Sequence, residues 1–229
     1  MDKIFTHSGA TGDIIFSLPT IKAMGGGTLI VTNFHKQRYE SVKPLLEVQD
    51  YITYVDWSDE PVPNSINLDS FRNYVTHHDN IVEANFKAQG LSVAENQWWR
   101  NGWLTLPDKQ NLINGIKYSV INRTTNYADP NFNWATEVDY LKTISDEVFF
   151  IGYADEYTIF NNKFNTNVKF FNCNFLESAY LIKNAVMFTG CYSAMSTIAM
   201  GLGINYRMEQ APNHTCSSLL MPRETIINV

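Results

Sequence analysis

Residues 3–24 read KIFTHSGATGDIIFSLPTIKAM, and this stretch decides the fold class. A short apolar run around Ile4 and Phe5 leads into a polar turn with two glycines, and apolar residues then recur at helical spacing: Ile14, Ile15, Leu18, Ile21 and Met24. This order predicts a strand, a loop and a helix.

The loop between this strand and helix is the first candidate site. We expect it to contain six residues: His7, Ser8, Gly9, Thr11, Gly12 and Asp13. Its glycines let a ligand approach the main chain, and the helix N-terminus directs free N–H groups at it, which predicts binding of an anion or a polar substrate. Asp13 has two interpretations, a helix cap or a member of the site, and spacing alone favours the cap.

Strands and helices alternate after this opening. The glycines at 25–27 end the first helix, and residues 28–32, TLIVT, have the β-branched apolar character of a buried parallel strand. A helix over 43–48 and a strand over 51–55 follow, as in doubly wound α/β proteins. Such sheets bind ligands beyond the carboxyl ends of their strands, where the opening loop lies. This location favours a site over a simple cap for Asp13.

Residues 57–107 contain no functional motif that we can interpret, but they contain an aromatic cluster with an arginine: Trp98, Trp99, Arg100 and Trp103. Such a cluster can stack on sugars or bases, yet large aromatics more often belong to the core, and we favour the core. His77 and His78 are adjacent, so they make a poor metal-binding pair. We expect no metal and no other cofactor.

A second alternating set follows a predicted crossover at 104–115. We therefore expect two lobes, residues 1–112 and 113–229. A strand over 116–121 ends in the polar residues Asn122, Arg123 and Thr124. The fork of donors on Arg123 suits a phosphate, whereas the alternative is an ordinary surface arginine.

The chain then continues to alternate. We expect helices at 134–145 and 176–184, a helical turn at 156–160, and strands at 147–151, 168–171 and 185–189.

Residues 188–203, FTGCYSAMSTIAMGLG, repeat the architecture of the opening stretch. A strand leads to Gly190, then to the hydroxyl residues Ser193, Ser196 and Thr197, and then to a helix of small residues. Such a turn can hold a diphosphate, although any doubly wound lobe needs similar turn chemistry. One glycine and hydroxyl turn in each half predicts two lobes that face each other across a cleft.

Composition sets further bounds. The chain has 229 residues, is 45% hydrophobic and carries a formal net charge of −6, as expected for a globular protein with a real core and no overall attraction to nucleic acid. Nucleic acid is neither supported nor excluded as a partner. Cys173, Cys191 and Cys216 show no CxxC spacing and no signal peptide is present, so we expect a cytoplasmic protein. No apolar run approaches the length of a membrane span.

Four segments together resemble the small, often virus-encoded relatives of the family-nine glycosyltransferases, whose best-known members transfer heptose from ADP-heptose to lipopolysaccharide. They read HSGATGDIIFSLPTIKAM, NRTTNY, FFIGYADEYTIF and LIKNAVMFTGCYSAMSTIAMGLGI. Gly12-Asp13 followed by Leu18-Pro19 matches the GD…LP signature of the family. The resemblance implies an α/β protein with the GT-B fold, two Rossmann-like lobes with mostly parallel sheets, and transfer without a bound metal.

The resemblance also implies roles for the residues. Asp13 corresponds to the proposed general base, on the N-terminal lobe that takes the acceptor. The C-terminal lobe would hold the nucleotide-sugar donor, with Arg123, Thr124 and Ser193 stabilising the leaving diphosphate. Gly190, Ser196 and Thr197 complete that turn, and Glu209 is assigned to the donor ribose.

Two alternative functions stay open. One is a glycosyltransferase for hydroxymethylated bases of viral DNA, with the tryptophan and arginine cluster along the nucleic acid. The other is a non-catalytic protein that binds a nucleotide sugar or a glycan, because fold alone does not determine the reaction. We expect a monomer or a homodimer.

Overall fold

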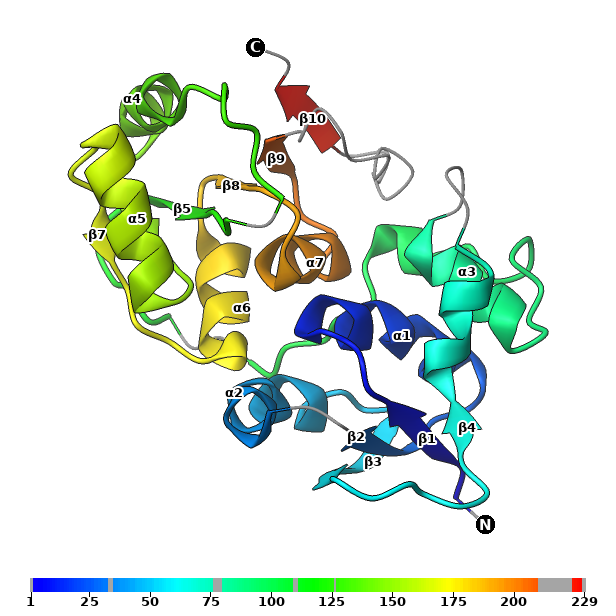
Figure 1. Ribbon diagram of the computed structural model, residues 1–229. Coiled ribbons are helices and arrows are strands. Elements are labelled where there is room, and N and C mark those ends of the chain that lie inside the picture. The colour runs from blue at the N-terminus through cyan, green and yellow to red at the C-terminus, as the bar shows by residue number, and fades with distance from the viewer. Residues whose placement is uncertain are drawn as a thin grey trace. The chain divides into compact units, whose positions relative to one another are not determined.

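The computed structural model describes residues 2–32, 35–75, 80–108, 111–125, 127–209 and 224–227 (Figure 1). The chain divides into two compact units. The first contains the described parts of 2–107 together with 201–203, and the second contains those of 108–200 and 204–209 with 224–227.

The first unit is built on a parallel sheet in the order β3-β2-β1-β4. Its strands are β1 (Ile4–His7), β2 (Gly27–Thr32), β3 (Ile52–Ser58) and β4 (Ile66–Asn67). Its helices are α1 (Thr11–Ala23), α2 (Lys36–Glu47) and α3 (Ile81–Ala88), with the 3-10 turns η1 (Leu68–Asn73) and η2 (Trp98–Asn101). The α/β alternation expected from the sequence is confirmed.

The start of α1 differs from the sequence prediction. Thr11, Gly12 and Asp13 form its first turn and do not belong to the loop, because Ala10 is the N-cap and its carbonyl accepts the N–H of Ile14 at 3.1 Å. The first N–H groups of a helix have no hydrogen-bond partner within the helix. Its first turn therefore tolerates small polar residues that are also typical of loops. The loop itself is only residues 8–10.

Two tryptophans of the aromatic cluster belong to the core of the first unit. Trp99 is 1% exposed and Trp103 is 2% exposed, and their rings meet edge to face with centroids 6.4 Å apart. The core interpretation is therefore confirmed for Trp99 and Trp103, whereas Trp98 and Arg100 are partly exposed.

The second unit has a parallel sheet in the order β10-β9-β8-β5-β6-β7. Its strands are β5 (Tyr118–Asn122), β6 (Glu147–Phe150), β7 (Lys169–Phe170), β8 (Phe188–Gly190), β9 (Tyr206–Glu209) and β10 (Glu224–Ile227). Its helices are α4 (Trp134–Ile144), α5 (Ala154–Phe164), α6 (Phe175–Asn184) and α7 (Ala194–Gly201). Counted from β5, the strand order is the 3-2-1-4-5-6 order of dinucleotide-binding folds, and the first unit repeats its 3-2-1-4 portion.

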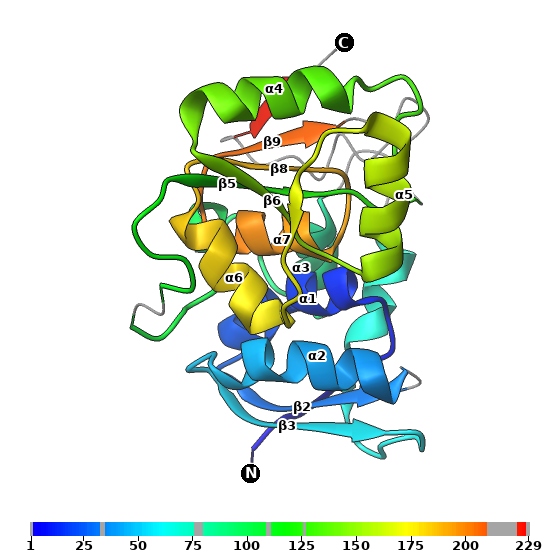
Figure 2. The same ribbon diagram turned by 90° about the vertical axis from the view of Figure 1, so that its left-hand side faces the viewer.

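Helices cover both faces of this second sheet. Figure 2 shows α4 on one side of the sheet and α6 and α7 on the other. On the α4 side, Trp134 and Phe160 of α5 pack with Ile121 and Phe150, and the Trp134 and Phe160 ring centroids lie 5.3 Å apart. The two faces are thus filled as the alternation of strands and helices requires.

The described residues also bear on the predictions about membrane spans and cysteines. No described helix is both long enough and apolar enough to cross a membrane. Cys173 and Cys191 are free thiols. Cys216, His77 and His78 lie outside the described residues.

Candidate functional site

Each sheet has one place where its strand order reverses, between β1 and β4 in the first unit and between β5 and β8 in the second. In open α/β sheets, ligands bind beyond the carboxyl ends of the strands at such a reversal. The segments that follow these four strands are therefore where a site is expected.

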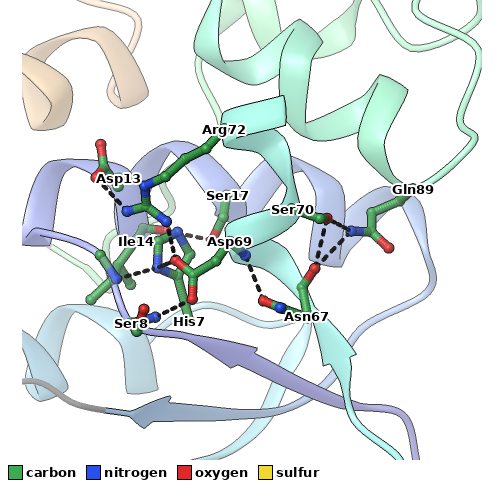
Figure 3. A network of polar contacts seen from close by, with 11 residues as sticks. His7, Ser8, Asp13, Ile14, Ser17, Asn67, Asp69, Ser70, Arg72 and Gln89 are labelled. Atoms are coloured by element: carbon green, nitrogen blue, oxygen red, sulfur yellow. Dashed lines mark hydrogen bonds and ion pairs between the residues drawn. The ribbon is translucent and has the colours of Figure 1, made fainter. Parts of the chain in front are cut away.

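In the first unit, the two strands at the reversal bring four charged or titratable side chains together (Figure 3). His7 is the last residue of β1, and Asp13 lies in the first turn of α1. Asp69 and Arg72 come from η1, directly after β4. His7 is fully buried, whereas 29% of the Asp13 side chain is exposed. The cluster thus has a buried base and a solvent-accessible carboxylate.

Arg72 bridges the two carboxylates of this cluster. Its Nη2 donates to Asp13 Oδ2 at 3.3 Å, and its Nη1 pairs closely with Asp69 Oδ1. The main-chain N–H of Ser8 donates to Asp69 Oδ2 at 2.8 Å. The loop after β1 and the turn after β4 are therefore joined through Asp69.

His7 is a neutral member of the cluster. The Gly9 N–H donates to its Nδ1 at 2.9 Å, which places the ring proton on Nε2. Burial lowers the pKa of His7 to about 4, although Asp69, with Oδ1 3.3 Å from Nδ1, acts in the opposite direction. At neutral pH the imidazole is uncharged and positions the Gly9 amide.

Gly9 is required by the close approach of its neighbours. A Cβ at this position would lie 2.6 Å from Arg72 Nη2, 2.6 Å from His7 Cε1 and 2.9 Å from Asp13 Oδ2. The missing side chain leaves the space that the Arg72 and Asp13 contact occupies.

The two carboxylates have opposite electrostatic environments. Burial raises the pKa of Asp13 above its ordinary value, with Arg72 acting against that shift. Burial alone would also raise the pKa of Asp69, but His7 and the hydrogen bonds from Arg72 and Ser8 bring it below the ordinary value. Asp13 is thus the stronger base of the pair, and Asp69 the more permanent anion.

In the second unit, Asn122 connects the segments that follow β5, β6 and β8. Ser193 donates its hydroxyl to Asn122 Oδ1 at 2.7 Å, and Asn122 Nδ2 donates to the carbonyl of Ile151 at 2.7 Å. The Thr124 N–H donates to Cys191 Sγ at 3.1 Å. Thr124 and Ser193 are both partly exposed at this reversal of the strand order.

Ser196 and Thr197 have contacts within their own turn. They are 1% and 2% exposed, and their hydroxyls donate to the Ser193 carbonyl at 2.8 and 3.1 Å. Ser196 Oγ also accepts the Ser193 N–H at 3.0 Å. Gly190, the last residue of β8, is buried. These residues shape the turn before α7.

Arg123 is not a surface arginine, so that alternative is wrong. Its side chain is 7% exposed and pairs with the fully buried carboxylate of Glu209, with Nε 3.1 Å from Oε2 and Nη2 3.2 Å from Oε1. Glu209 also accepts the Asp129 N–H at 2.6 Å and the Trp134 indole N–H at 2.9 Å. Burial raises the pKa of Glu209, against the effect of Arg123. The ion pair joins β5, β9 and the start of α4.

Sequence reasoning missed Asp69, Arg72 and Asn122 as members of these clusters. Asp69 and Arg72 follow a strand of two residues, too short to produce a periodic signal. Asn122 had a detectable signal, because it is the polar end of a predicted strand. No group of three His, Cys, Asp or Glu side chains suited to a metal occurs in the described part of the chain.

Solved structures share this fold along almost the whole chain. The glycosyl transferase family 9 structure from Veillonella parvula DSM 2008 has a TM-score of 0.71 at 11% identity and covers 99% of this chain and 85% of its own. The E. coli ADP-heptose lps heptosyltransferase II has a TM-score of 0.70 at 12% identity, with 100% and 91% covered. E. coli heptosyltransferase WaaC with ADP-2-deoxy-2-fluoro heptose has a TM-score of 0.60 at 12% identity, with 99% and 93% covered.

The fold is therefore that of the GT-B glycosyltransferases, and the resemblance expected from the sequence is confirmed at the level of the fold. No protein-family model and no curated protein matches the sequence.

Proposed function

We propose that this protein is a glycosyltransferase that moves a sugar from a nucleotide-activated donor to an acceptor hydroxyl. The similar structures are glycosyl- and heptosyltransferases, and one of them was solved with an ADP-linked sugar analogue. The observation that carries the proposal is Asp13, a partly exposed carboxylate with a raised pKa where the strand order of the first sheet reverses.

Asp13 would act as the general base. It takes the proton of the acceptor hydroxyl while the hydroxyl oxygen forms a bond to the anomeric carbon. The bond between that carbon and the phosphate oxygen breaks, and its electron pair leaves with the nucleotide diphosphate. A carboxylate with a raised pKa accepts this proton more readily than an ordinary aspartate.

The donor would be bound by the second unit. Thr124, Ser193 and the N–H groups at the start of α7 are the donors that we assign to the diphosphate. The Ser193 hydroxyl has one proton, so it would give up its hydrogen bond to Asn122 Oδ1 when the donor binds. The roles predicted for Arg123 toward the diphosphate and for Glu209 toward the ribose stay proposals, and both would require their buried, mutually neutralising ion pair to open. We further propose that these groups act without a metal or other cofactor and that the acceptor binds the N-terminal lobe. We also propose that the protein is a virus-type glycosyltransferase and works in the cytoplasm.

The test begins with donor binding. Thermal shifts of the wild-type protein against ADP-heptose and common UDP-, GDP- and ADP-hexoses identify the donor, because a ligand that binds the folded state stabilises it. Release of nucleotide diphosphate then measures turnover in the wild type, in Asp13→Asn and in Asp13→Ala, with and without EDTA.

We expect the Asp13 variants to keep the thermal shift and to lose at least about 100-fold in turnover. Full turnover in Asp13→Asn would remove Asp13 from the mechanism, and sensitivity to EDTA would overturn metal independence. Binding without any turnover would favour the non-catalytic alternative. A gel shift with hydroxymethylated duplex DNA would favour the viral DNA alternative, although burial of Trp99 and Trp103 leaves only Trp98 and Arg100 of that cluster partly exposed.

A further inference from the structure

Asp69 is held in place by hydrogen bonds other than its contact with Arg72. Its own N–H donates to the Asn67 side chain at 2.9 Å, and its Oδ2 accepts the Ser8 N–H. Gln89 ties the same turn to the end of α3, since its Nε2 donates to the Asn67 carbonyl at 3.0 Å and to Ser70 Oγ at 2.9 Å. The Asp69 carboxylate is thus fixed relative to both β1 and η1 (Figure 3).

Arg72 is oriented by this fixed carboxylate and by an aromatic ring. Its Cζ lies 4.8 Å from the centroid of Phe71, whose own ring is 4% exposed and lies 6.0 Å from that of His7. Phe71 and Asp69 together set the guanidinium plane, because an arginine fork is rigid. The Nη2 of Arg72, which is not used in the pair with Asp69, donates to Asp13 Oδ2.

We propose that Arg72, anchored by Asp69, is a positioning residue that orients the Asp13 carboxylate, and that the absence of a side chain at Gly9 leaves room for this contact. No motif in the sequence marks this arrangement. The inference rests on the proposed function only for the role of Asp13 as base; the arrangement itself can be tested without a substrate.

The charges around Asp13 determine the direction in which its pKa moves when Arg72 is replaced. Arg72 and a main-chain hydrogen bond from Ala10 favour the ionised carboxylate, whereas burial and Asp69 favour the protonated form, and His7 is neutral. Removal of the Arg72 charge therefore raises the pKa of Asp13. Arg72→Lys keeps the charge but loses the fork, so it should restore part of the effect.

The experiment is a pH titration of the Asp13 carboxyl carbon by NMR in protein labelled with 13C-aspartate, with the signal assigned from Asp13→Asn. In Arg72→Gln the midpoint should move to higher pH, and in Arg72→Lys it should move less. In Gly9→Ala it should move in the same direction, because the added methyl would displace the Arg72 head group. Arg38→Gln, an exposed arginine on α2 outside these contacts, is the matched control and should leave the midpoint in place.

An unchanged midpoint in folded Arg72→Gln and Arg72→Lys would overturn the inference, and so would an equal shift in Arg38→Gln. Once the donor is known, Arg72→Gln should lower kcat on the order of 100-fold with little change in KM. The acid limb of its pH profile should move upward. Absence of any turnover would end the proposed function, and turnover that does not need Asp13 would end its role as base. Either result would leave the NMR titration intact, so these failures are distinguishable from failure of the inference.

Discussion

Trp103 donates its indole Nε1–H to the main-chain carbonyl of Ile15 at a distance of 3.0 Å. Ile15 lies inside α1, where its carbonyl would normally accept the N–H of the residue four positions later. That residue is Pro19, which has no N–H. The tryptophan therefore satisfies an acceptor that the proline leaves open, and both side chains are buried.

This relationship predicts a coupling between Trp103 and Pro19. Trp103→Phe keeps most of the aromatic packing but leaves the Ile15 carbonyl without its donor, which should lower the free energy of unfolding by about 1–3 kcal/mol. In a Pro19→Ala background, the N–H of residue 19 can serve the same carbonyl, so Trp103→Phe should cost about 1 kcal/mol less. Urea unfolding of the four proteins in this double-mutant cycle measures the difference. An equal cost in both backgrounds would show that the indole acts through packing alone.

The buried pair of Arg123 and Glu209 predicts a large loss of stability on truncation. Glu209→Ala leaves the Arg123 charge, the Asp129 N–H and the Trp134 indole without their acceptor, so the free energy of unfolding should fall by about 3–5 kcal/mol. The matched control is Glu147→Ala, which removes a pair to Lys169, whose side chain is 59% exposed, and should cost at most about 1 kcal/mol. Urea unfolding of both variants measures the two losses. Similar losses would contradict a structural role for Glu209.

Periodicity made most of the fold predictable. The opening strand and helix, the glycine turn at 25–27 and the alternation that follows depend on local spacing, which the structure preserves. Three strands could not be predicted. β4 has only two residues, and β10 is a four-residue segment with two apolar residues. β9 lacks an apolar run because Arg207 and Glu209 carry charges that are neutralised by partners far away in sequence.

The candidate site was predictable where the chain supplies it locally. Asp13 lies beside glycines after the first strand, so both its position and its chemistry are legible in the sequence. Asp69 and Arg72 join it only because β4 pairs with β1, which no local pattern reveals. The surface interpretation of Arg123 failed for the same reason, because its buried partner is far away in sequence.

His7 predicts a loss of stability in mild acid. Its pKa is about 4 in the folded protein and 6.5 in the unfolded chain, so the unfolded chain binds more protons as the pH falls below about 6.5. The free energy of unfolding should therefore decrease between pH 6.5 and pH 4, by up to about 3 kcal/mol from this residue. His7→Asn, whose Oδ1 can still accept the Gly9 N–H, should show a flatter dependence. Parallel stability curves for the two proteins would refute the assignment of a neutral, buried His7.

Ser193 predicts a selective loss of ligand binding. Its hydroxyl donates to Asn122 Oδ1 and is partly exposed at the turn that we assign to the diphosphate. Ser193→Ala should therefore reduce the thermal shift given by whichever nucleotide sugar the screen identifies, with a loss in affinity of roughly 10-fold for one missing hydrogen bond. Thr158→Ala removes an exposed hydroxyl from α5 that donates only to the Ala154 carbonyl among the contacts described, and it should bind the same ligand like the wild type. If both variants bind equally well, the diphosphate lies elsewhere and Ser193 serves only to hold Asn122 at the end of β5.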